Sequence, residues 1–139
     1  MELLNYIFNL NLILLALDHL VTGTLAIFYP IKAIAFYRVI FGADLPFTKE
    51  NIFILKPWGA LGIFASMIGV LPLFDPVKYR VILLPLVVLL LLRIYIRYTH
   101  GKDGEKYLSI DKKRNATHIY LIILCATLIL FQFFVVGLK

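Results

Sequence analysis

The chain has 139 residues, of which 62% are hydrophobic and 16% are charged, and its mean hydropathy is +0.93. A soluble domain has roughly 45–50% apolar and about 25% charged residues, so this composition excludes an ordinary soluble domain. The net charge of +6 lies beside apolar segments, so we expect membrane lipids, and no nucleic acid, as partners of the basic residues.

Several segments are long and apolar enough to cross a bilayer, which takes about 20 residues. The four candidates lie at about 4–29, 52–74, 79–99 and 116–137. They predict an all-α, integral membrane four-helix bundle in which residues 1–139 form a single transmembrane domain. The first segment lacks a basic n-region and is too long for a signal peptide, so we expect a retained anchor.

The stretch after the first span is apolar and aromatic, but it is too short to cross the membrane. Residues 31–41 carry only Lys32 and Arg38 as charges, which favours a short helix at the cytoplasmic interface. Gly42 is suited to end this helix, and Thr48 is suited to cap the span that follows.

Small residues share one face of the second span, at spacings of three and four. They are Gly59, Gly62, Ser66 and Gly69. Such a face lets helix backbones approach closely in lipid, so it predicts helix packing rather than a ligand groove. The third span is rich in Leu and Val on all sides between 81 and 92, which indicates contact with lipid. The hydrophilic stretch 101–115 is expected to be a solvated loop.

Basic residues are distributed unevenly along the chain. Eleven of the 14 Lys and Arg residues lie around the loops that follow the first and third spans. The exceptions are Lys78, Arg80 and Lys139. The positive-inside rule then places those two loops in the cytoplasm and both termini outside, and we expect a bacterial inner membrane.

A basic stripe ends the third span. Arg93, Arg97 and His100 follow one another at spacings of four and three. We expect these residues to anchor the helix at the membrane interface. The alternative is a more specific role, in which they bind phosphate headgroups.

Polar residues inside the first and fourth spans form the candidate ligand-binding site. Those of the first span are Asn11, Asp18, Thr22 and, beside them, His19; those of the fourth are His118, Cys125 and Gln132. In antiparallel helices, residues at equal depth have numbers with a constant sum. This register would pair Asn11 with Gln132, Asp18 with Cys125, and Thr22 with His118, which predicts a polar pocket between the two spans.

Asp18 is the most informative of these residues, because an ionisable side chain at membrane depth is costly and marks a site by default. We expect it to find a partner on the fourth span, with His118 about one turn away. Two interpretations stay open. Asp18 either clamps the helices together through a hydrogen bond, or belongs to a ligand or proton site.

No familiar catalytic motif is present, since the chain has no Walker A loop, no HExxH and no GxSxG. Its single cysteine, Cys125, excludes an internal disulfide and a CxxC motif. We therefore predict no metal, no cofactor and no catalytic residue, and leave open whether the protein is an enzyme.

One resemblance rests on the run from His19 to Pro30, the pair Phe41-Gly42, and the glycine-rich span that starts at Trp58-Gly59. Together these motifs resemble small bacterial four-helix membrane proteins of the DoxX-like group, over roughly residues 19–70. The resemblance implies a four-helix bundle, and better-studied members look like accessory subunits of quinone-linked complexes. A looser similarity, to the sterol-isomerase and sigma-2-receptor superfamily, is architectural; its sites use a pair of buried acids, whereas this chain has one.

These observations favour a non-enzymatic membrane protein that binds a lipid-like or other apolar small molecule, or that acts as an accessory subunit or a homo-oligomer. The alternative is a small proton-coupled transporter or an intramembrane enzyme that uses Asp18 and His118.

Overall fold

The computed structural model describes residues 2–136, and this range is helical with no β-strand. The elements are α1 (Glu2–Phe28), α2 (Pro30–Phe41), α3 (Lys49–Gly69), α4 (Leu71–Phe74), a 3-10 turn (Arg80–Ile82), α5 (Leu83–Thr99), α6 (Gly101–Leu108) and α7 (Lys112–Val136). Four helical stretches are long and apolar enough to cross a membrane: α1, α3 with α4, α5 with its 3-10 turn, and α7. The predicted all-α membrane fold is thereby confirmed. Lys139 and the end of the last predicted span lie outside the described residues.

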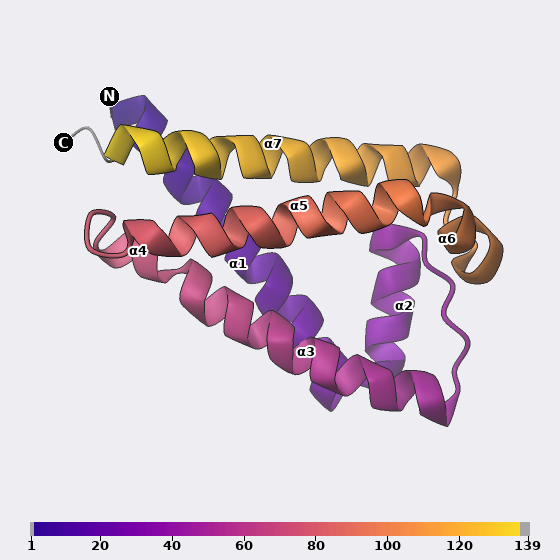
Figure 1. Cartoon of the computed structure of the whole chain (residues 1–139). Coiled ribbons are helices and arrows are strands. Elements are labelled where there is room, and N and C mark those ends of the chain that lie inside the picture. The colour runs from indigo at the N-terminus through magenta and orange to yellow at the C-terminus, as the bar shows by residue number, and fades with distance from the viewer. Residues whose placement is uncertain (1, 137–139) are drawn as a thin grey trace.

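The long helices associate as two antiparallel pairs (Figure 1). α1 packs mainly against α3, and α5 packs mainly against α7, whereas contacts between the pairs are few. Figure 1 shows the pairs approaching each other near α4 and diverging toward α2. The start of α1 and the end of α7 lie at the same end of the molecule.

The α1–α3 pair is joined by a glycine seam, which consists of Gly23, Gly59 and Gly62. A Cβ added to Gly23 would lie 2.6 Å from the Gly59 carbonyl oxygen, and one added to Gly59 would lie 2.7 Å from the Gly23 oxygen. Backbone therefore meets backbone, which only glycine permits at this separation. The predicted packing role of the small face on the second span is confirmed at Gly59 and Gly62, and Gly62 also lines a cavity.

The α5–α7 pair is joined by an aliphatic seam. It is built from Leu83, Leu86, Val87 and Leu90 of α5 and Ile122, Ala126 and Ile129 of α7, with Leu12 of α1 packed on the same cluster. The prediction that the third span contacts lipid on all sides is therefore wrong. One face of α5 is core, and a helix that is apolar all round offers no sequence signal to tell the two faces apart.

Local capping explains where several helices begin and end. Gly42 ends α2 in a left-handed conformation with φ of 67°, and the Thr48 side chain accepts a hydrogen bond from the Asn51 amide at the start of α3, both as predicted. The stretch expected to be a loop differs, because it forms α6 and the first turn of α7. There the Asp111 carboxylate accepts hydrogen bonds from the amides of Lys113 and Arg114, which caps α7 earlier than hydropathy suggests.

Candidate functional site

A cavity of about 510 Å³ lies between the two helical pairs, where they diverge. Its lining comes from α1, α2, α3, the 3-10 turn and α5, and none of it comes from α7. The lining residues are Asp18, His19, Thr22, Tyr37, Phe41, Trp58, Leu61, Gly62, Phe64, Ala65, Ile68, Ile82, Pro85, Leu86, Leu89 and Arg93. Most of these side chains are apolar, and a volume of this size is within the range of small-molecule sites.

One side of the cavity is open at the flank of the bundle. Trp58, Leu61 and Phe64 of α3 line it, yet they remain 66%, 62% and 61% exposed. These residues lie within a helix that is long enough to span the membrane. The open side of the cavity therefore lies along a candidate membrane-spanning helix.

The polar groups of the cavity gather around His19. Its Nδ1 lies 2.8 Å from the Leu15 carbonyl oxygen, and its Nε2 lies 3.4 Å from Arg93 Nη1. A guanidinium can only donate, so Nε2 must accept and the proton of a neutral ring must be on Nδ1, where it faces the carbonyl. Both contacts thus agree on a single neutral tautomer.

Asp18 is adjacent to this contact but is less enclosed. Its side chain is 39% exposed, against 13% for His19, and its Oδ2 lies 3.8 Å from His19 Nδ1. Because the Nδ1 proton is already directed at the Leu15 carbonyl, the carboxylate is left as a hydrogen-bond acceptor facing the cavity. The polar end thus presents a carboxylate and a guanidinium on either side of a neutral imidazole.

Thr22 and Tyr37 complete the polar end. The Thr22 hydroxyl donates to the Asp18 carbonyl at 2.6 Å, and the Tyr37 hydroxyl donates to the Thr22 carbonyl at 3.5 Å. Burial raises the pKa of the Tyr37 hydroxyl above its usual value, and the nearby Asp18 charge acts in the same direction. Tyr37 therefore stays a neutral donor that connects α2 to α1.

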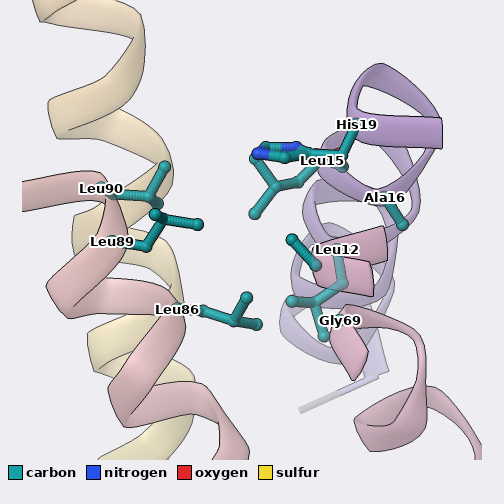
Figure 2. Close-up of a pocket in the computed structure, with 9 residues that line it drawn as sticks. Leu12, Leu15, Ala16, His19, Gly69, Leu86, Leu89 and Leu90 are labelled. Carbon is teal, nitrogen blue, oxygen red and sulfur yellow. The ribbon is translucent and has the colours of Figure 1, made fainter. Parts of the chain in front are cut away.

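A second, much smaller void lies beside the cavity and shares His19 with it (Figure 2). Figure 2 shows His19 and Leu15 of α1 facing Leu89 and Leu90 of α5 across this space. Its volume of about 10 Å³ is at the lower limit for one water molecule. The larger cavity is therefore the candidate ligand site.

The observed register between α1 and α7 differs from the predicted one. Asn11 Nδ2 donates to the Cys125 carbonyl at 3.4 Å, whereas the equal-depth rule paired Cys125 with Asp18. The shift is about two helical turns. Figure 1 shows α1 crossing α7 at an angle, so residues at equal depth do not lie opposite one another along the two helices. Gln132 is only 3% exposed, and its Oε1 has no hydrogen-bond partner among the described residues.

His118 occupies a different environment from the one expected. Its Nε2 lies 3.2 Å from the Ile40 carbonyl, and its ring centroid lies 5.3 Å from that of Phe41. Arg114 Nη1 donates to the Arg38 carbonyl in the same turn of α2, at 3.4 Å. Donors at the last carbonyls of a helix are favourable, so these contacts attach α2 to α7. The predicted pairing of His118 with Asp18 is not formed.

The three residues of the basic stripe each have a different partner in the structure. Arg93 turns toward His19 and the cavity, Arg97 Nη1 donates to Asn115 Oδ1 at 3.1 Å, and His100 Nδ1 lies 3.1 Å from Asp103 Oδ2. Arg93 thus belongs to the cavity, which sequence spacing did not suggest. Its periodicity matched that of an interfacial stripe, and only the tertiary arrangement of the helices places it opposite His19.

Within residues 2–136, no three His, Cys, Asp or Glu side chains are grouped so that they could hold a metal ion. The chain matches no protein-family model, no curated protein and no solved structure. The DoxX-like resemblance therefore stays a prediction, and the function has to be argued from the geometry of the cavity.

Proposed function

We propose that this protein binds a lipid-like molecule in the cavity between its two helical pairs. The observation that carries the proposal is the cavity itself, about 510 Å³ in volume, apolar over most of its wall, and with polar groups at one end. An amphiphile has the same arrangement, a long apolar part with a polar group at one end. The open flank at Trp58, Leu61 and Phe64 supplies a route from the bilayer.

The residues that line the cavity are better suited to binding a ligand than to catalysis or proton transfer. A proton-coupled or catalytic site built on Asp18 and His118 needs these two side chains within reach of each other. His118 instead contacts the carbonyl end of α2. The cavity retains one acid, one guanidinium and one neutral imidazole, which are suited to orienting a headgroup.

A cavity-filling variant tests the proposal. Ala65 lines both the cavity and the small void, so Ala65→Phe should occupy the space of the ligand. Met67, two residues further along α3, is 63% exposed and lines neither, which makes Met67→Phe the matched control. We expect native mass spectrometry to show a co-purifying lipid-like molecule on the wild type and on Met67→Phe, and its loss from Ala65→Phe.

Equal retention by Ala65→Phe and the wild type would show that the molecule is bound elsewhere. Thermal unfolding in detergent checks that Ala65→Phe is folded. If it is not, Leu89→Trp, which places a bulkier side chain on the α5 wall of the cavity, provides a second test.

We also propose the orientation expected from the basic residues, with both termini outside and residues 101–115 in the cytoplasm. Ser109 is exposed at the end of α6, so it is a suitable labelling position. In a Cys125→Ala background, Ser109→Cys should resist a membrane-impermeant thiol reagent in intact cells and react after permeabilisation. Reaction in intact cells would reverse the orientation.

A further inference from the structure

Arg93 carries a positive charge that the described residues leave without an ionic partner. Within residues 2–136, the contacts shorter than 4 Å between basic and acidic side chains join His19 to Asp18, Arg38 to Asp44, and His100 to Asp103, and Arg93 is in none of them. Its one hydrogen-bond contact is with a neutral imidazole nitrogen. Arg93 is partly buried near the end of a candidate span, and a partly buried guanidinium is stabilised by an accompanying anion.

The contact with His19 also orients Arg93. The Leu15 carbonyl holds the imidazole through Nδ1, and Nε2 then accepts one of the five guanidinium N–H donors. The other donors remain available on the side of the cavity. His19 is thus a positioning residue, which holds the guanidinium at the wall of the cavity.

We infer that Arg93 binds the carboxylate of a long-chain carboxylic acid whose apolar tail lies along the α3–α5 wall of the cavity. This inference rests on the proposed function and adds the class of headgroup. A planar guanidinium matches a carboxylate through two parallel hydrogen bonds. The tail would contact Trp58, Leu61 and Leu89, which are apolar lining residues of the same cavity.

The cavity wall also bears on the choice between a carboxylate and a phosphate headgroup. Most of it is apolar, and Asp18 adds an acid to the lining. A phosphate monoester carries about two negative charges at neutral pH, so taking it out of water costs more than for a singly charged carboxylate, and one guanidinium can neutralise only one of its charges. Among anionic headgroups, the site therefore favours the one with the smaller charge.

Trp58 supplies the measurement, because it is the only tryptophan in the chain and it lines the cavity. Purified protein in phosphatidylcholine nanodiscs is titrated with dibromostearic acid, whose bromine atoms quench tryptophan fluorescence. Parallel titrations use its methyl ester and an alkyl phosphate of equal chain length with the same bromine positions. We expect half-quenching by the acid at a concentration about tenfold below that of the ester, since a hydrogen-bonded charge is lost in the ester.

Arg93→Gln should remove this preference, so that the acid and the ester reach half-quenching at similar concentrations. The matched control is Arg97→Gln, one turn further along α5, because Arg97 donates to Asn115 and does not line the cavity. It should keep the tenfold preference. Arg93→Lys retains the charge without the planar fork and should keep a reduced preference.

The remaining outcomes of these titrations would each contradict a different part of the inference. Equal titrations for the acid and the ester on the wild type would exclude an acidic headgroup while leaving the lipid cavity in place, and this comparison does not depend on any variant folding. Tighter binding of the alkyl phosphate would exclude the carboxylate. Loss of the preference in Arg97→Gln as well would remove the assignment to Arg93. If the acid quenched Ala65→Phe as effectively as it quenches the wild type, the proposed function itself would be overturned.

Discussion

The two helical pairs are held together by opposite means. In the α1–α3 pair, the glycine seam brings the backbones so close that a Cβ at Gly23 or Gly59 would meet the carbonyl oxygen of the facing helix. In the α5–α7 pair, the aliphatic seam keeps the backbones apart through interlocking Leu and Ile side chains. Backbone contact leaves no freedom to adjust, whereas packed side chains can rearrange. The pairs do not share one geometry, and they diverge to leave the ligand cavity between them.

The largest effect is expected in the glycine seam. A Cβ at Gly59 would meet the Gly23 oxygen at 2.7 Å and the Ala26 Cβ at 2.9 Å, and backbone cannot move aside as a flexible side chain can. Gly59→Leu should therefore cost more than the roughly 1–3 kcal/mol typical of an overpacked core. Thermal unfolding in detergent measures this. Gly104→Leu is the control, since its nearest neighbour is 3.6 Å away. Similar melting of both variants would contradict the seam.

A smaller loss is expected in the aliphatic seam. Ile129 is fully buried, and Ile129→Ala removes side-chain contacts without forcing backbones apart. In water-soluble cores such a change costs about 2–5 kcal/mol. In a membrane protein, lipid replaces water outside the bundle, so only the packing part remains and we expect about 1–2 kcal/mol. Ile123→Ala on the exposed side of the same helix should melt like the wild type. A cost for Ile129→Ala as large as that of Gly59→Leu would show that the two seams do not differ in kind.

A polar clamp closes one end of the aliphatic seam. Arg80 Nε donates to the Phe133 carbonyl at 2.8 Å, and the guanidinium lies 4.2 Å from the centre of the Phe133 ring. Arg80→Gln removes both the charge and the ring contact, so we expect a loss of about 1 kcal/mol in unfolding experiments. Arg80→Lys keeps the charge over the ring and should lose less. If Arg80→Lys lost as much as Arg80→Gln, the ring contact would contribute nothing.

The smallest effect on stability is expected at Asp18, in the cavity that separates the pairs. Its side chain is 39% exposed and its nearest basic nitrogen is 3.8 Å away, so Asp18→Asn should change stability by less than about 0.5 kcal/mol. It should at the same time strengthen binding of a carboxylic acid, because a like charge is removed from the polar end. A large stability loss with unchanged acid binding would instead identify Asp18 as a helix clamp.

Sequence patterns predicted much of the fold because each acts locally. Hydropathy located the four spanning helices, Gly42 ended α2, and Thr48 capped α3, since each signal depends on a residue and its near neighbours along the chain. The start of α7 was missed by four residues, because Asp111 caps it within a stretch whose charges suggested a loop.

Only part of the cavity lining could be predicted from the sequence. Asp18, His19 and Thr22 stood out as polar residues in an apolar helix, and they do line it. Their partners did not stand out. Arg93 matched an interfacial stripe, and the α3 wall consists of apolar residues with no distinguishing pattern. The predicted pairing with α7 assumed parallel helix axes, whereas α1 crosses α7 at an angle.

The sequence by itself determined that this chain is a membrane-spanning helical protein, because burying apolar helices in lipid requires no particular partner. It also determined which side chains are costly at membrane depth. Only the tertiary structure decided which helices pair, at what register, and where a cavity remains. These depend on distances between backbones, and a few glycines set such distances for helices far apart in the sequence. The meeting of His19 with Arg93 follows from that arrangement and has no signal of its own along the chain.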